Sequence, residues 1–186
     1  MRFRFATARD LYAAYPTVAQ DMRARPNDRP VLSFCRTLLV SRIPEEAITF
    51  CSYILPNRVA VWWGHECLEN LSAALDEFDL SMLEHVHGWV SDPSEYRRGM
   101  LMDAALTAEQ RSPGVWIALA AAWSQEDPQR PSGYPRSAQV NRTARAVSTG
   151  ILAGLARVAL PDRAAALTGF VAMGIQLAEF EASRYS

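Results

Sequence analysis

The fold of this chain is decided by residues 43–75, which read IPEEAITFCSYILPNRVAVWWGHECLENLSAAL. Pro44 precedes two glutamates, which is typical of a helix start, because a first-turn proline lacks the N–H that would go unpaired there. Acids in the first turn also favour the positive end of the helix dipole. A second proline interrupts the apolar run at residues 55–57. The stretch therefore predicts a helical hairpin, with helices at 45–54 and 56–75.

Start signals of the same kind recur along the chain. Thr7 and Asp10 form a capping-box pattern, residues 92–95 read DPSE, and residues 112–113 read SP. No run alternates with the period of two that is typical of strands. We therefore expect an all-α fold of about eight helices in antiparallel pairs, either a compact bundle or a short helical solenoid. Beyond the hairpin, the predicted helices cover residues 7–22 with a break at Pro16, 31–40, 80–90, 95–109, 115–123, 142–160 and 162–182.

The length of 186 residues predicts a single domain, residues 1–186. Residues 124–140, SQEDPQRPSGYPRSAQV, form a proline-rich loop in this interpretation, because their composition is incompatible with a continuous helix or strand. Loops of this length are uncommon in compact domains and are often functional.

The last two helices are rich in small residues, namely Gly150, Gly154, Gly169 and Gly174. Such residues let two helix backbones approach closely. Charged residues at 157, 162 and 163 keep the apolar run well below the roughly 20 residues that span a bilayer. We expect a soluble helical hairpin and no insertion into a membrane.

Charge is distributed unevenly, although the net charge is only −1. Residues 1–42 carry eight arginines and three acids, residues 43–96 carry one arginine and ten acids, and residues 97–186 carry ten arginines and seven acids. No dense basic patch indicates a nucleic-acid partner. Lysine is absent, which excludes a P-loop or Schiff-base lysine. The start of the chain has no apolar core of signal-peptide length, and the three cysteines do not form a CxxC pair, so we expect a cytoplasmic protein without disulfides.

The residues most suggestive of chemistry are His65, Glu69 and Cys67. His65 and Glu69 are four residues apart on the predicted helix and could occupy two positions of a metal. The helical projection places Cys67 in the apolar arc and His65 at its rim. His85 and His87 fall on opposite flanks of the next helix, so they cannot chelate one ion together. Since no further ligand and no catalytic motif is indicated, we assign no catalytic residue, metal ligand or cofactor.

Trp62 and Trp63 lie 100° apart on a helix, so they cannot both face one core. Trp63 borders the apolar arc, whereas Trp62 lies on the polar side near Glu66 and Glu69. Burial of Trp62 under a neighbouring helix is the simpler interpretation. The alternative is an exposed aromatic anchor beside acids, a composition that suits a protein-contact surface made of Trp62, His65, Glu66 and Glu69.

Several sequence runs resemble a family of uncharacterised bacterial all-helical proteins. The runs are PEEAITFCSYILPNRVAVWWGHECL at 44–68, DLYAAYP at 10–16, SPGVWIALAAAW at 112–123, and the segments 143–147 and 170–174. The resemblance implies an accessory component associated with type VI secretion gene clusters, and it supplies no catalytic residues.

Two hypotheses follow for the function. The first is a non-catalytic cytoplasmic interaction protein, an accessory or adaptor of a bacterial type VI-like secretion system, with protein partners and with a homo-oligomer left open. The alternative is a small metal-dependent or cysteine-based enzyme that uses the region of His65, Cys67 and Glu69.

Overall fold

The computed structural model describes residues 3–124 and 141–184. The predicted loop at 124–140 therefore lies outside the described residues, apart from Ser124. In chain order, the described elements are α1 (Ala8–Ala14), α2 (Val18–Asp21), α3 (Val31–Leu38), α4 (Glu46–Ile54), α5 (Asn57–Glu69), a short 3-10 helix η1 (Ser72–Ala74), α6 (Glu77–Ser91), α7 (Glu95–Thr107), α8 (Pro113–Ala122), α9 (Arg142–Ala156) and α10 (Leu160–Arg184).

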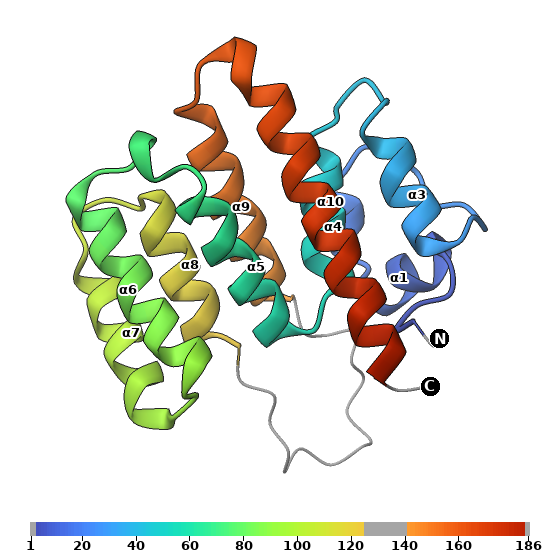
Figure 1. The fold of residues 1–186 in the computed structure, drawn as a ribbon. Helices are drawn as coiled ribbons and strands as arrows, with labels where there is room; N and C mark the ends of the chain where they lie inside the picture. The colour runs from blue at the N-terminus through green and yellow to red at the C-terminus, as the bar shows by residue number, and fades with distance from the viewer. Residues whose placement is uncertain (1–2, 125–140, 185–186) are drawn as a thin grey trace.

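The fold is all-α, which confirms the predicted class (Figure 1). Across the described residues there is no strand, only an isolated backbone bridge between Thr7 and Pro30. Among the helices described, none combines the length and the hydropathy that crossing a membrane requires. The helix count is close to the expected eight, and the division of the first helix at Pro16 into α1 and α2 adds one.

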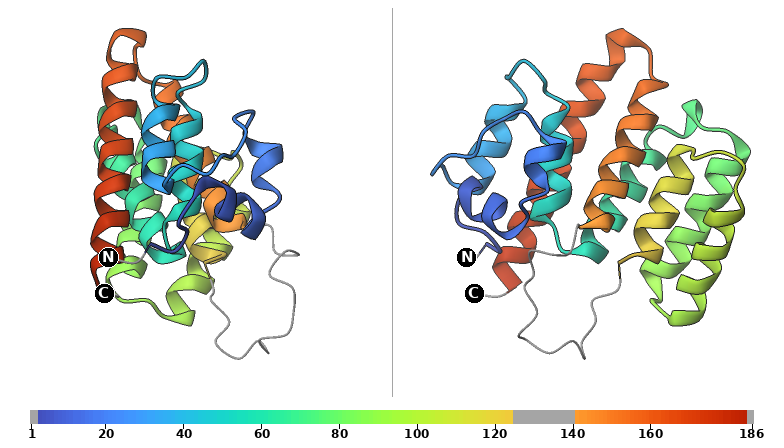
Figure 2. Two further views of the ribbon diagram at one scale, coloured as in Figure 1. Left: turned by 90° about the vertical axis from the view of Figure 1, so that its right-hand side faces the viewer. Right: turned by 180° about the vertical axis from the view of Figure 1, so that it is seen from behind.

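The helices form two layers. α5, α6 and α10 lie toward the viewer in Figure 1, and α7, α8, α9 and the N-terminal helices lie behind them, as the rear view in Figure 2 shows. α8 contacts α9, α6, α7 and α5, while α9 also contacts α5 and α4. α8 and α9 therefore connect the two ends of the molecule, even though residues 125–140 separate them in sequence.

Local signals determine where most helices begin. The Thr7 side chain accepts from the Asp10 backbone N–H, and the Asp10 carboxylate accepts from the Thr7 N–H, which completes the predicted capping box. α6 begins at Glu77, three residues earlier than predicted, because the Asp76 side chain accepts a hydrogen bond from the Asp79 N–H. Asp76 therefore acts as the N-cap of α6.

α5 ends at Glu69, before the predicted Leu75. The side-chain amide of Asn70 donates to the Glu66 carbonyl at 2.8 Å, which satisfies a carbonyl at the end of the helix. The chain then passes through η1, and Leu71 turns into the core.

α4 and α8 are buried around their whole circumference. Every residue of α4 from Glu46 to Ile54 is buried, and so is every residue of α8 except Trp116. Four of the ten residues of α8 are alanine, and such small side chains let neighbouring helices approach closely. The two helices predicted as a hairpin are both present, but they pack mainly on other helices: α4 on α9, α10 and α3, and α5 on α9, α6 and α8.

The glycines of α9 and α10 do not pair with each other, so the predicted close hairpin is wrong. A Cβ at Gly150 would meet Ile117 of α8, one at Gly154 would meet Leu68 of α5, and one at Gly174 would meet Trp63 of α5. Gly169 faces open space. α9 and α10 are joined at one end and diverge around α4 and α5 (Figure 1). The small residues serve contacts with helices that are distant in sequence.

A buried carboxylate joins three helices. The side chain of Asp79, on α6, is 0% exposed. Its Oδ1 accepts from the Gly114 N–H of α8 at 2.7 Å, and its Oδ2 accepts from Arg157 Nη1, at the end of α9, at 2.7 Å. Ser112, which the sequence predicts as the cap of α8, makes no capping bond. Asp79 therefore supplies the cap of α8 from another helix.

Replacement of Asp79 by alanine should destabilise the fold. The change leaves the Gly114 N–H buried without an acceptor and removes the partner of Arg157, which together cost about 2–4 kcal/mol. Glu84→Ala is the matched control, since Glu84 is an exposed acid on the same helix, and it should change stability by less than about 0.5 kcal/mol. Urea unfolding followed by circular dichroism measures both. Equal stability of the two variants would contradict the role of Asp79.

Two glycine-to-alanine changes should have opposite signs. A Cβ at Gly114 would lie 2.7 Å from the backbone oxygen of Asp79 and 2.9 Å from its Cα, so Gly114→Ala forces α6 and α8 apart and should cost about 1–3 kcal/mol. Gly169→Ala meets nothing within 4 Å and should stabilise α10 by up to about 1 kcal/mol. Thermal unfolding of both variants tests these contacts. Equal melting temperatures of the two variants would contradict the close packing at Gly114.

Candidate functional site

α5 places three of the four predicted contact residues on one face. Trp62, Glu66 and Glu69 are spaced by four and three residues, so their side chains share a stripe of the helix. The side chain of Glu69 is 45% exposed and that of Glu66 is 34% exposed. Trp62 is half-buried, which is intermediate between the buried and the exposed positions that the sequence leaves open. We name this stripe the α5 acidic face.

Trp63 instead points into the core, where it is fully buried. Its indole Nε1–H donates to the Phe170 carbonyl of α10 at 2.9 Å. The two adjacent tryptophans therefore have different roles: Trp63 holds α10 against α5, and Trp62 borders the surface.

His65 is buried, with 5% exposure, rather than lying at the rim of the helix as the projection predicts. The projection considers α5 alone, whereas α6 packs beside it and brings the His87 ring to 5.4 Å from the His65 ring. His65 Nδ1 lies 3.1 Å from Glu66 Oε1, and its Nε2 lies 3.8 Å from Glu69 Oε1. His65 therefore lies beneath the two carboxylates and contacts both, and it adds little exposed area itself.

The geometry does not favour the metal alternative. His65 and Glu69 do approach each other, but within the described ranges no group of three or more His, Cys, Asp or Glu side chains is arranged to hold a metal ion. The His87 ring lies near that of His65, with an angle of 41° between the two ring planes.

All three cysteines are free and buried. Cys35 Sγ and Cys51 Sγ lie 3.2 Å apart between α3 and α4. The hydrogen bond that Cys51 shares with Cys35, together with burial, raises the pKa of the Cys51 thiol well above its ordinary value. Burial and the nearby Glu66 carboxylate do the same for the pKa of Cys67. Because the thiolate is the nucleophile, these environments disfavour cysteine catalysis.

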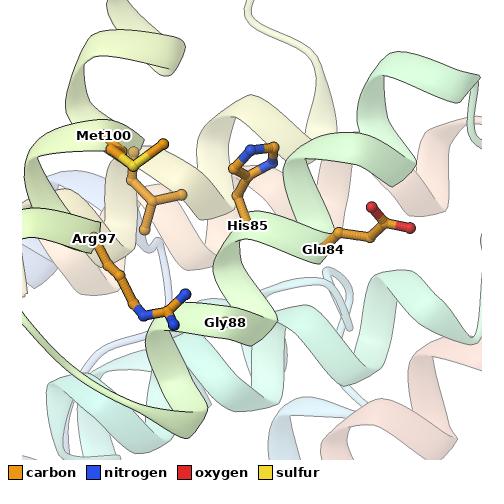
Figure 3. A pocket seen from close by; sticks show the side chains of 6 residues that line it. Glu84, His85, Gly88, Arg97 and Met100 are labelled. Atoms are coloured by element: carbon orange, nitrogen blue, oxygen red, sulfur yellow. The ribbon is translucent and has the colours of Figure 1, made fainter.

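A small hollow of about 270 Å³ lies between α6 and α7 (Figure 3). Glu84, His85 and Gly88 line it from α6, and Arg97, Met100 and Leu101 line it from α7. Arg97 Nε lies 3.5 Å from Asp92 Oδ2, and His85 Nδ1 lies 2.7 Å from the Ser81 carbonyl of its own helix. The Glu84 carboxylate points away from Arg97 (Figure 3). The hollow thus brings together no acid and base that could act on one substrate.

A larger groove, of about 660 Å³, is lined mainly by residues of α9. Its residues come from α2, α4, α8 and α9, and the sequence interpretation does not include them: Asp21, Thr49, Trp116, Trp123, Arg142, Arg145, Ala146, Ser148, Thr149 and Leu152. The seven-residue spacing of Trp116 and Trp123 is the one sequence signal that places two aromatic side chains on a common helix face.

The buried cysteines should be unreactive in the folded protein. A dithionitrobenzoate reagent at mildly alkaline pH should label none of the three thiols until denaturant is added, and then all three, because burial and raised pKa values keep them as thiols. The increase in absorbance should follow the unfolding transition. Rapid labelling of one thiol in the native protein would restore the cysteine-enzyme alternative.

Comparison with curated proteins gives no match, and comparison with solved structures gives none either. A family model does match, over residues 34–178, which is more than half of the chain. That range begins in α3, contains α5 with its acidic face, and ends in α10. The chain belongs to a family of unknown function, DUF6931.

Proposed function

We propose that this protein is a non-catalytic cytoplasmic adaptor that binds a basic protein partner through the α5 acidic face, as an accessory of a bacterial type VI-like secretion system. The observation that carries the proposal is the combination of Trp62 with the exposed carboxylates of Glu66 and Glu69 on one face. Tryptophan beside charges is characteristic of interface hot spots. The secretion context rests on the sequence resemblance alone.

The contacts beneath the face support this function. His65 Nδ1 lies within hydrogen-bonding distance of the Glu66 carboxylate, so Glu66 is held in place before a partner arrives, and His65 Nε2 lies 3.8 Å from the Glu69 carboxylate. Preorganised side chains lose less conformational entropy on binding. The four residues predicted from the sequence thus lie together, with His65 as a support rather than as a contact residue.

Most acids of residues 43–96 also remain accessible to a partner. Of these ten acids, Glu46 and Asp79 are buried, and both are used inside the fold. Glu46 accepts from the backbone N–H groups of Arg23 and Ala24. The remaining acids of residues 43–96 are exposed or partly exposed and give this part of the surface a negative potential, which increases the association rate of a basic partner.

Charge reversal on the α5 acidic face should remove the partner without unfolding the protein. The double variant Glu66→Arg/Glu69→Arg should recover at least about tenfold less of each specific partner from cells that express the protein naturally. Asp103→Arg/Glu109→Arg is the matched control, since both acids are exposed on or just after α7. Quantitative mass spectrometry of the captured proteins, with circular dichroism to check folding, gives the comparison.

Two outcomes decide the proposal. Recovery should also fall as salt rises from about 0.1 to 1 M, since the screening length falls from about 10 to about 3 Å. If both double variants capture the same proteins in the same amounts, the α5 acidic face is not the contact surface. Light scattering of the same variants shows whether the partner is a second copy of the chain.

A further inference from the structure

The groove along α9 combines flat aromatic surfaces with positive charge. Trp116 of α8 and Trp123, the residue that directly follows this helix, are two turns apart on one face, and both are only partly buried. Across from them, α9 presents Arg142, Arg145 and Thr149 at spacings of three and four residues, so these side chains share one stripe along the floor.

The charge of Arg145 is neutralised by an ion pair with Asp21. Arg145 Nε lies 2.8 Å from one carboxylate oxygen of Asp21 and 3.0 Å from the other, and the Tyr53 hydroxyl donates to the same carboxylate at 2.6 Å. Burial and this hydrogen bond raise the pKa of Tyr53 far above its ordinary value, so the phenol stays a donor. Asp21, Tyr53 and Arg145 thus form a satisfied triad that fixes one wall of the groove.

Arg142 differs, because its guanidinium lies over the Trp123 ring, 6.0 Å from the ring centroid. It is the first residue of α9, is exposed, and sits at the positive end of that helix. A guanidinium stacked on an aromatic ring keeps its edge N–H groups available for an anion. With Asp21 and Arg145 paired, the lining residues that the structure describes carry one net positive charge, at Arg142.

We propose that this groove binds a small aromatic anion. The guanidinium of Arg142 holds the carboxylate or phosphate group, and Trp116 and Trp123 pack against the planar ring. A cavity of about 660 Å³ lies within the range of about 300–1,000 Å³ that is typical of small-molecule sites. No residue of α5 is among those that line the groove, so the groove shares no residue with the α5 acidic face.

Titration calorimetry with matched probes tests the site. AMP serves as an aromatic phosphate with adenosine as its neutral counterpart, and indoleacetate serves as an aromatic carboxylate with indoleacetamide as its counterpart. At least one anion should bind with a Kd below about 1 mM, and at least about tenfold tighter than its neutral counterpart. The tighter of the two anions identifies phosphate or carboxylate as the group that Arg142 holds.

Variants separate the two parts of the site. Arg142→Gln should weaken the anion at least about tenfold and leave the neutral counterpart unchanged, because it removes only the charge-assisted hydrogen bonds. Trp116→Leu should weaken both probes, and Trp116→Phe should restore part of the loss if the ring is what matters. Arg184→Gln, which removes an exposed arginine paired with Glu181 on α10, is the control and should bind like the parent protein.

The proposal fails if neither anion binds with a Kd of about 1 mM or lower. It also fails if Arg142→Gln, shown by circular dichroism to be folded, binds the anion as tightly as the parent protein. Neither result bears on the α5 acidic face, whose test uses other residues.

Discussion

The carboxylate of Asp79 is the interaction on which the arrangement of the central helices depends. It is completely buried, and it accepts from the first turn of α8 and from the arginine at the end of α9. A buried charge is tolerated only when it is paired and hydrogen-bonded, so the geometry around it has little freedom. Because Gly114 must approach the Asp79 backbone closely, the carboxylate also sets the distance between α6 and α8.

Other acids repeat this role at the opposite end of the fold. Asp21 joins α2 to Tyr53 of α4 and to Arg145 of α9, and Glu46 fixes the backbone at residues 23–24. Each acid bridges segments that the apolar core alone would leave free to slide. Apolar packing is non-directional, whereas hydrogen bonds to a carboxylate specify one register.

The sequence predicts what local chemistry controls. Helix starts at Thr7, Ser94 and Pro113 depend on a few neighbouring residues, and so does the division at Pro16. The partners of the α9 and α10 glycines, the burial of His65 and the remote cap of α8 depend on helices that are far apart in sequence. For the candidate site, the clustering of the α5 residues was predictable from helical spacing. The groove was not, because Asp21, Trp116 and Arg142 share no local pattern.

The hydrogen bond between Trp63 and Phe170 has a consequence for synthesis of the chain on the ribosome. Every residue of α4 is buried, yet α10, which packs on α4 and α5, lies far downstream of both in the sequence. Until residues near 170 emerge, the nascent chain carries these two helices without their cover. Such surfaces are prone to aggregation, so the early chain is a natural client for chaperones that shield hydrophobic segments. Completion of the core therefore waits for α10 in this fold.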